Sequence, residues 1–347
     1  MDASGASPFK FGAWAGIARH GEKLILSDIE AGLEKIIWTF GGGKGGCGKT
    51  FIAANLAISL AKEGSEVVLF DGGFGSANAH SALGIKPPTK TLSDFTRGDV
   101  ADLADLLVPS PVKHLSLLPA AADFLTAANI SYALKSKIIK RMKTLKCDHL
   151  LVDIGPGVNF NGVDLFLESD AGVIVITPEP AAIELAYRFI RAAVYRRLKA
   201  SADRPLFEQI VDEYLESRKE GNLVAAVEGA LEKIAKMDPA QAMRMERNLY
   251  GMDLYLVVNM ARDHHDRYIG HSICEIVKKF YGLEMSYSGH IPYDDRATLS
   301  ARRGRPFIRE YEKSETTACF NLVLKDILGR VSEKMRAKVQ QLNLINA

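Results

Sequence analysis

The segment KIIWTFGGGKGGCGKTFIAANLAISLAKEG, residues 35–64, decides the fold. An apolar run ends at Phe40, a glycine-rich stretch follows, and a helical pattern begins near Lys49. Within it, Gly43 to Thr50 has the spacing G-x-x-x-x-G-K-T, in which backbone amides and a helix N-terminus surround phosphate oxygens. We expect the Lys49 amine to contact the terminal phosphates and the Thr50 hydroxyl to bind Mg²⁺. The segment therefore predicts a phosphate-binding loop.

A second pattern competes for the same glycines. Residues 43–48 also fit G-x-G-x-x-G, and Asp71 ends the next apolar run, as in dinucleotide-binding folds. Lys44 and Lys49 decide between the two patterns, because a cation at the positive end of a helix dipole is unfavourable by roughly 0.3–1 kcal/mol. The negative charge of a triphosphate offsets the unfavourable position of these two lysines better than the charge of a pyrophosphate does, because the loop amides already bind a pyrophosphate. We therefore favour the phosphate loop over the dinucleotide fold and over a purely structural turn.

Short apolar runs alternate with helical patterns along the rest of the chain. Their residues are continuously apolar, which is typical of parallel strands buried on both faces of a sheet. The runs cover residues 35–40, 66–70, 114–118, 149–153, 171–177, 254–259 and 285–289. The predicted fold class is α/β, with a mostly parallel, doubly wound central sheet flanked by helices.

One connection exceeds the length of a single crossover helix. Between the apolar runs at 171–177 and 254–259, the residues from about 195 to 250 are surplus and show further helical patterns. Basic and acidic side chains balance in this stretch. We therefore expect a neutral helical insertion, 195–250, that offers a surface to a protein partner.

The overall composition excludes several classes of protein. The 347 residues are 47% hydrophobic and carry a formal net charge of +2, so there is material for a core and no general electrostatic footprint for nucleic acid. The four cysteines form no C-x-x-C pair, and the sequence shows neither a secretory signal nor a long apolar span. We expect a cytoplasmic protein without a disulfide framework.

The stretch KGGCGKT, with its lysine in the first half of the loop, resembles the deviant phosphate loop of the MinD/ParA family of ATPases. Other segments are similar to that family, and most of all to its MinD/FlhG branch: TLSDFTRGD (91–99), LSLLPA (115–120), DHLLVDIGPGV (148–158), VITPEPAAIELAYRFI (175–190), VVNMAR (257–262) and GHIPYDDRATLSARRGRP (289–306). The resemblance implies ATP and Mg²⁺ as cofactors. It also implies a homodimer in the ATP state, in which Lys44 reaches the phosphates bound by the partner protomer.

The resemblance further implies roles for individual residues. The nucleotide-binding residues of the loop are Gly43, Lys44, Gly45, Gly46, Cys47, Gly48, Lys49, Thr50 and Phe51. Base recognition is implied for Asn259, Pro292, Tyr293 and Asp294. Thr50 would bind Mg²⁺ directly and Asp153 through a water. The switch positions are Gly73, Asn78, Gly155, Pro156 and Gly157, and the residues expected to take part in hydrolysis are Lys44, Lys49 and Asp71. Taken without the resemblance, Asn259 is an ordinary turn residue and Asp153 an ordinary strand-end cap.

The first switch departs from the family pattern. The family commonly has D-x-D here, whereas FDGGFGSANAH, residues 70–80, has Asp71 followed by glycine at position 73. The missing carboxylate helps to orient the attacking water, and no other carboxylate occurs between Asp71 and Asp94. We therefore expect nucleotide binding with slow hydrolysis.

The ends of the chain lie outside the resemblance. Residues 1–34 form an N-terminal extension without a clean period, and residues 35–310 form the P-loop domain. Residues 311–347 form a C-terminal helix with an apolar stripe, which predicts packing on the domain or, as the alternative, peripheral attachment to the inner face of a membrane. An arginine run within 302–309 favours a solvated helix end over a DNA contact.

Three functional interpretations follow from these observations. The first is a nucleotide-gated dimeric switch in cellular positioning or regulation, of flagellar, division or chromosome-partitioning type. The second is a pseudo-ATPase that dimerises on ATP with little hydrolysis, which Gly73 favours. The third, an oxidoreductase or metal-cluster carrier of related fold, is disfavoured because the chain lacks a C-x-x-C pair and its loop carries two lysines.

Overall fold

The computed structural model describes residues 35–73, 78–120, 132–216 and 223–345. The predicted N-terminal extension, 1–34, lies outside these residues. In the described part, eight strands form one sheet in the order β3-β4-β2-β5-β1-β6-β7-β8, and every neighbouring pair is parallel except β3 and β4. The strands are β1 (Ile36–Gly41), β2 (Val67–Gly72), β3 (Val108–Pro109), β4 (Leu115–Leu118), β5 (His149–Ile154), β6 (Ala171–Ile176), β7 (Leu254–Ala261) and β8 (Met285–Pro292).

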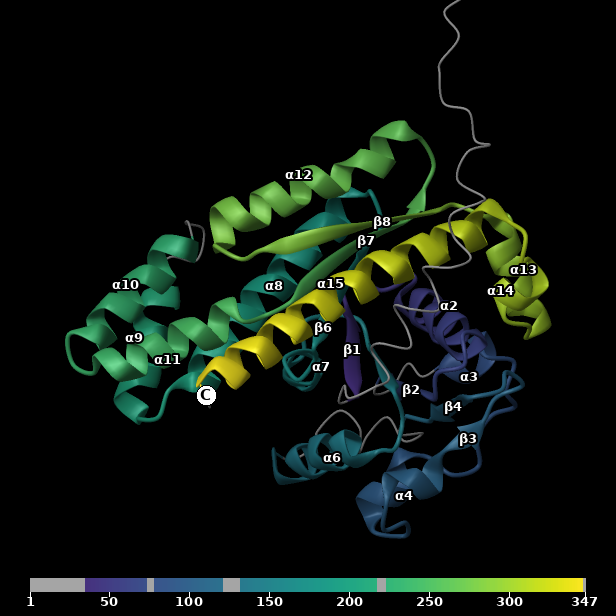
Figure 1. Cartoon of the computed structure of the whole chain (residues 1–347), viewed down its shortest axis with the longest axis horizontal. Helices are drawn as coiled ribbons and strands as arrows, with labels where there is room; N and C mark the ends of the chain where they lie inside the picture. The colour runs from purple at the N-terminus through teal and green to yellow at the C-terminus, as the bar shows by residue number, and fades with distance from the viewer. Residues whose placement is uncertain (1–34, 74–77, 121–131, 217–222, 346–347) are drawn as a thin grey trace, which may run out of the picture. The chain divides into compact units, whose positions relative to one another are not determined.

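Helices connect the parallel strands and cover the sheet on both sides (Figure 1). They are α2 (Lys49–Lys62), α3 (Ala79–Ala82), α4 (Leu92–Arg97), the 3₁₀ helix η1 (Leu103–Leu106), α6 (Tyr132–Thr144), α7 (Phe160–Phe166), α8 (Pro180–Ser201), α9 (Pro205–Glu216), α10 (Leu223–Ala235), α11 (Pro239–Tyr250), α12 (His264–Tyr281), α13 (Asp295–Arg303), α14 (Phe307–Glu310) and α15 (Glu315–Ile345). The predicted α/β class with a mostly parallel, doubly wound sheet is confirmed.

Successive strand residues point to opposite faces of the sheet and enter two separate hydrophobic clusters. In β1, Ile37 belongs to the cluster under α6 to α12, while Ile36 and Trp38 belong to the cluster under α2 and α15. This alternation follows from the two-residue period of a strand. Since both faces are buried, the central strands β1, β2, β5 and β6 are buried at every position and mostly apolar, which is the pattern that predicted them.

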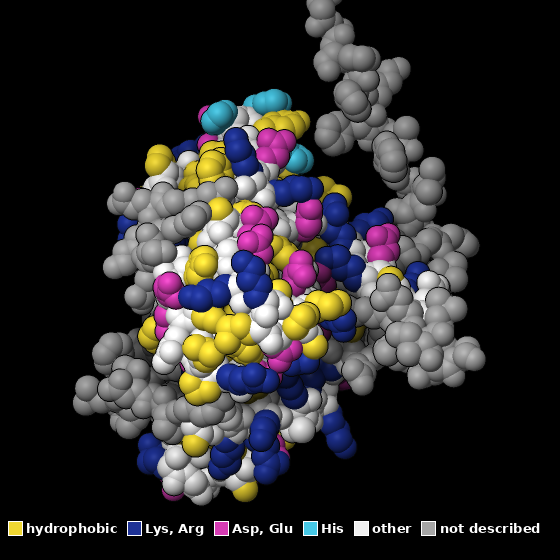
Figure 2. All heavy atoms as spheres, turned by 90° about the vertical axis from the view of Figure 1, so that its left-hand side faces the viewer, with side chains coloured by type: hydrophobic (Ala, Val, Ile, Leu, Met, Phe, Trp, Pro, Cys, Tyr) yellow, Lys and Arg dark blue, Asp and Glu magenta, His cyan; other side chains and the backbone are white. Residues whose placement is uncertain are grey.

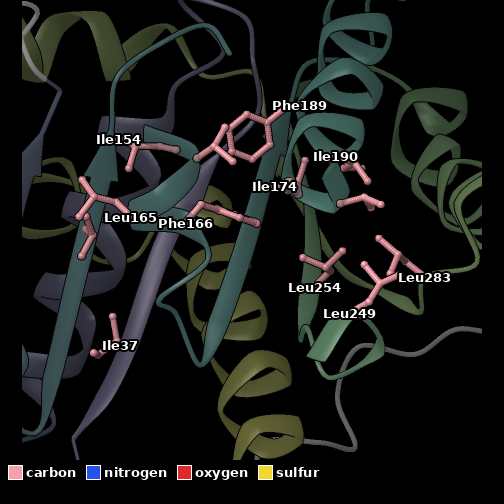
Figure 3. Close-up of a cluster of buried hydrophobic side chains, with 14 of the residues drawn as sticks. Ile37, Ile154, Leu165, Phe166, Ile174, Phe189, Ile190, Leu249, Leu254 and Leu283 are labelled. Atoms are coloured by element: carbon pink, nitrogen blue, oxygen red, sulfur yellow. The ribbon is translucent and has the colours of Figure 1, made fainter. Parts of the chain in front are cut away.

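The helices α9, α10 and α11 lie between β6 and β7 and share the first of these clusters. Phe207, Val211 and Ile234 are fully buried within it. Figure 3 shows Leu249 beside Leu254 and Leu283 in the same cluster that contains the edge-to-face pair of Phe166 and Phe189, whose ring centroids are 5.0 Å apart. The three helices are therefore packed onto the core of the nucleotide domain through their apolar faces.

The long helix α15 buries its apolar stripe against the opposite face of the sheet. Its buried members are Phe320, Val323, Leu324, Ile327, Leu328 and Val331. The stripe is thus occupied by intramolecular packing as far as Val331. Among the helices that the structure describes, none combines the length and the apolar character needed to cross a membrane.

Candidate nucleotide-binding site

The glycine-rich loop joins the carboxyl end of β1 to the first residue of α2. Gly46 and Gly48 have positive φ angles of 81° and 88°, which a residue with a Cβ atom rarely adopts. Gly48 is the N-cap of α2 and offers no side chain to the first-turn amides. The amides and the positive end of the helix dipole are therefore available to an anion.

The Lys49 side chain folds back over this loop. Its Nζ donates to the carbonyl oxygen of Lys44 at 3.0 Å and lies 3.7 Å from Cys47 Sγ. Only 7% of Lys49 is exposed. A nearly buried ammonium at a helix N-terminus is unfavourable unless an anion shares the site.

Thr50 and Asp153 meet at the edge of the sheet where β1 and β5 both end. The Thr50 hydroxyl donates to Asp153 Oδ2 at 2.5 Å. Asp153 is 4% exposed, and within the described residues its Oδ1 is buried without a hydrogen-bond partner. Burial, and secondarily the charge of Asp71, raises the pKa of Asp153 to about 7. A hydroxyl and an orphaned carboxylate oxygen are the ligand types that Mg²⁺ prefers, so these residues fit the ion.

A cavity of about 330 Å³ lies against the loop. Its lining comes from the loop, the start of α2 and the ends of β2 and β5. The described lining residues are Gly45, Gly46, Gly48, Lys49, Thr50, Phe51, Asp71, Gly73, Asn78, Asp153, Ile154, Gly155 and Pro156. All but Ile154 are residues that the sequence predicted for the site. The structure therefore brings the predicted loop, metal and switch residues to one space.

Asp71 ends β2 and is engaged by the first switch. Its Oδ2 accepts from the Ala79 amide at 3.0 Å, and its Oδ1 accepts from the Gly73 amide at 3.3 Å. Burial raises the pKa of this carboxyl above its usual value, against the effect of these amides. Asp71 thus holds the backbone of the switch, and Gly73 brings no side chain to the cavity.

The second switch touches the phosphate loop directly. The Gly157 amide donates to the Gly43 carbonyl at 2.6 Å. A Cβ atom placed on Gly45 would lie 3.7 Å from Pro156. The Gly-Pro-Gly turn is therefore in contact with the loop that would carry the phosphates.

Lys44 is not among the described residues that line the cavity. Its ammonium forms an ion pair with Glu179, the N-cap of α8. This partnership lowers the pKa of Glu179 below its usual value. Sequence reasoning missed Glu179, although its place directly before a helix-initiating proline in VITPEP could have indicated a position near the loop edge.

None of the four residues predicted for base recognition is among the described residues that line the cavity, and one of them, Asn259, contacts the phosphate loop. The Asn259 amide is buried and donates to the Cys47 carbonyl at 2.9 Å. Asp294 is the N-cap of α13, and its Oδ2 accepts from the Thr316 hydroxyl at 2.7 Å. Tyr293, which follows Pro292, is exposed, with the Arg262 guanidinium 3.9 Å from its ring centroid. Their role toward a base stays a prediction.

A parallel sheet whose first strand leads through a glycine loop and a buried lysine into a helix, with a threonine–aspartate pair at the strand ends, defines a P-loop nucleotide-binding protein. The model of the CobQ/CobB/MinD/ParA nucleotide binding domain matches residues 38–307. The chain therefore belongs to this family, and the predicted family resemblance is confirmed.

Curated relatives and solved structures agree with this assignment. The antiactivator FleN of Pseudomonas aeruginosa is 24% identical over 288 residues, which are 82% of this chain and 84% of FleN. The flagellum site-determining protein YlxH of Helicobacter pylori is 34% identical over 151 residues, 43% of this chain and 50% of YlxH, so the match spans half of that relative. The septum site-determining protein MinD of Pyrococcus horikoshii, solved with Mg-ADP, has the same fold, with a TM-score of 0.58 at 19% identity over 84% of this chain and 96% of that one.

Proposed function

We propose that this chain binds ATP with Mg²⁺ in the cavity beside the loop and acts as a nucleotide-gated dimeric switch. The observation that carries the proposal is the convergence of the loop amides, Lys49 and the Thr50–Asp153 pair on one space. These groups supply an anion site, a cation and metal ligands. The choice of an adenine nucleotide is supported by the solved MinD with Mg-ADP.

Different residues of the chain would bind the phosphates and the metal ion. Phosphate oxygens would replace the Lys44 carbonyl as acceptors of the Lys49 ammonium. Thr50 and Asp153 would hold Mg²⁺, which supplies charge neutralisation between the phosphates when it is bound. Because Gly157 already donates to Gly43, a nucleotide that moves the loop also moves the second switch.

Dimerisation in the ATP state is supported by the direction of Lys44. Its ammonium pairs with Glu179 and is absent from the lining of its own cavity. A loop lysine that does not serve its own nucleotide is available to the phosphates of a second protomer. The same geometry supports the homodimer that the resemblance implied.

The second candidate, a pseudo-ATPase, is favoured by one observation. The carboxylates among the described lining residues are Asp71, which is held by switch amides, and Asp153, whose Oδ2 accepts from Thr50 and whose unpartnered Oδ1 is suited to Mg²⁺. Gly73 supplies none. Slow turnover therefore belongs to the proposal, with a long-lived ATP state.

A partner surface on α9 to α11 is part of the same proposal. Met237, Met243 and Tyr250 are exposed on this segment. Figure 2 shows the face that contains this segment, where hydrophobic side chains are mixed with lysine, arginine and acidic residues in the middle of the view. Such a surface suits a protein better than DNA. Among the relatives, YlxH is named a flagellum site-determining protein, MinD a septum site-determining protein and FleN an antiactivator.

Two measurements on the whole chain test the proposal. Calorimetric titration with ATP and Mg²⁺ should show saturable binding, and light scattering should show a mass increase with ATP but not with ADP. Saturable binding without any change in mass would contradict the dimeric switch. Absence of binding would contradict the nucleotide site itself.

A further inference from the structure

Phe51 is the aromatic residue among the described lining of the cavity. It directly follows Lys49 and Thr50 on the first turn of α2. The remaining lining consists of glycines, polar or charged residues, Ile154 and Pro156. An aromatic ring thus stands next to the two residues that fix the position of the phosphates.

The Phe51 ring is held from behind by α14 and α15. Its centroid lies 5.5 Å from that of Phe307 and 5.5 Å from that of Phe320, at interplanar angles of 76° and 69°. One turn further along α2, Asn55 Nδ2 donates to the Phe51 carbonyl at 2.7 Å, and its Oδ1 accepts from the Ile308 amide at 3.1 Å. The first turn of α2 is therefore fixed to both helices, and the ring has a defined position.

The three rings differ in what they face. Phe307 and Phe320 are 1% and 0% exposed, whereas Phe51 remains partly exposed and belongs to the cavity wall. If Phe51 served only to anchor the core, complete burial would stabilise the fold more, since apolar surface that stays in water contributes no hydrophobic stabilisation. The exposed part of a rigid ring is instead suited to contact a flat or apolar ligand group.

The residues predicted for base recognition do not provide such a wall. The Asn259 side-chain amide donates to the Cys47 carbonyl. The Asp294 carboxylate caps α13 and accepts from the Thr316 hydroxyl. Tyr293 is covered on one face by the Arg262 guanidinium. Among the described residues of the cavity lining, the aromatic wall that adjoins the phosphate site is Phe51.

We propose that Phe51 is the nucleoside-contacting wall of the site, where its fixed ring packs on the base and ribose of the bound nucleotide. The inference rests on the proposed function, because it assumes that phosphates occupy the loop. It adds a role in selectivity. The loop amides and Lys49 recognise the phosphate chain, and Phe51 allows the site to distinguish a nucleotide from a polyphosphate that lacks base and ribose.

The test compares two probes on the same protein by calorimetry with Mg²⁺: ATP, and inorganic tripolyphosphate, which lacks base and ribose. Phe51→Leu keeps an apolar side chain against Phe307 and Phe320 but removes the flat ring. We expect it to weaken ATP by at least about fivefold, as loss of a stacking contact does, and to leave tripolyphosphate within about twofold. Phe207→Leu is the matched control, because it removes a fully buried ring from the other hydrophobic cluster, which contains neither Phe51 nor its aromatic neighbours, and its ratio of the two affinities should equal that of the wild type.

The outcomes separate the inference from the proposed function. If Phe51→Leu weakens both probes equally, or neither, the ring does not contact the nucleoside and the inference is overturned, while wild-type ATP binding still supports the proposed function. A wild-type protein that binds neither probe overturns the proposed function and the inference with it. Should Phe51→Leu fold poorly by circular dichroism, Phe51→Met, whose flexible side chain fills the same space, gives the same comparison.

Discussion

The ammonium of Lys44 pairs with the carboxylate of Glu179 at the start of α8, on the outer side of the phosphate loop. Both side chains are substantially exposed, so the pair contributes little to the stability of the fold. It engages the Lys44 ammonium, which is not part of the cavity lining, and it has to open before Lys44 can reach a nucleotide on another protomer. The pair is therefore a competitor of the proposed dimer contact.

This competition gives a prediction for two variants. Lys44→Ala should lose ATP-dependent dimerisation while the monomer still binds ADP, because Lys44 lies outside its own cavity. Glu179→Gln should dimerise at least as readily as the wild type, because the competing charge is gone. Light scattering with ATP or ADP is the measurement. A Lys44→Ala protein that dimerises normally would remove the reason for assigning Lys44 to the partner's phosphates.

Lys49→Ala should abolish nucleotide binding and leave the fold intact. The Lys49 ammonium is the cation that faces the loop, and its contacts with the Lys44 carbonyl and Cys47 Sγ contribute little packing. The matched control is Lys62→Ala at the end of the same helix, where the side chain forms a surface ion pair with Glu312. Calorimetry should show no ATP binding for the first variant and wild-type affinity for the second. Unchanged affinity in Lys49→Ala would contradict the phosphate-loop assignment.

The sequence predicted those parts of the site that depend on local pattern or on sheet geometry. The glycine spacing at 43–50 defines the loop, and parallel strands that end at one edge bring Thr50 and Asp153 together. The Lys44–Glu179 pair and the bond from Asn259 to Cys47 were not predicted. The first joins two side chains and the second a side chain and a backbone carbonyl. Neither contact follows from a local motif or from strands that end at one edge of the sheet, so a single sequence carries no signal for it.

Two further features show the same limit. The apolar periodicity of α9 to α11 predicted helices, but it could not tell whether their apolar faces pack on the domain or on a partner; Phe207 and Ile234 are buried in the domain core. The stripe of α15 posed the same question, and as far as Val331 it packs on the sheet. The sequence of an amphipathic helix shows which face is apolar, and tertiary packing determines whether the domain or a partner covers that face.

His149 should lower folding stability as the pH falls from about 6.5 to 4, against the opposite contribution of Asp153, whose raised pKa favours the folded chain at lower pH. His149 is buried in the core beside Trp38, whose Nε1 donates to its Nδ1 at 3.3 Å, and burial lowers the pKa of His149 to about 4 from 6.5. At His149 the unfolded chain binds a proton in this interval and the folded chain does not, so this contribution to stability rises with pH there. The contribution is about 3 kcal/mol, from about 1.4 kcal/mol per pKa unit.

Urea unfolding at a series of pH values measures this dependence. His149→Leu should make the slope of stability against pH less positive between pH 4 and 6.5, because only the His149 contribution is removed, at some loss of stability because Trp38 loses its acceptor. His265→Gln is the control, because His265 is exposed and its removal should leave the slope unchanged. A wild-type slope that persists in His149→Leu would assign the effect to other groups.

Gly73→Asp should raise ATP turnover by at least about tenfold. A group that holds the attacking water in line with the terminal phosphate is worth roughly 10²–10⁴-fold in rate, and tenfold is a conservative part of that range. Position 73 lines the cavity, while the two carboxylates of the described lining, Asp71 and Asp153, are bound to switch amides and to Thr50. A carboxylate at position 73 would not be bound to these partners. Adjacent glycines at 72 and 73 also leave the switch backbone little restricted, which a side chain would reduce.

Steady-state phosphate release, measured together with ATP affinity, tests whether Gly73→Asp raises turnover. Gly73→Asn is the matched control, because it adds a side chain of the same size without the charge and should raise turnover far less than Gly73→Asp. If the aspartate variant binds ATP normally and its rate is unchanged, the missing carboxylate is not the limiting factor. If the wild type already hydrolyses ATP rapidly and Lys49→Ala abolishes that activity, another group positions the water. Asp71 would then be the first residue to test, since a modest rearrangement of the switch would release its carboxylate from the Ala79 amide.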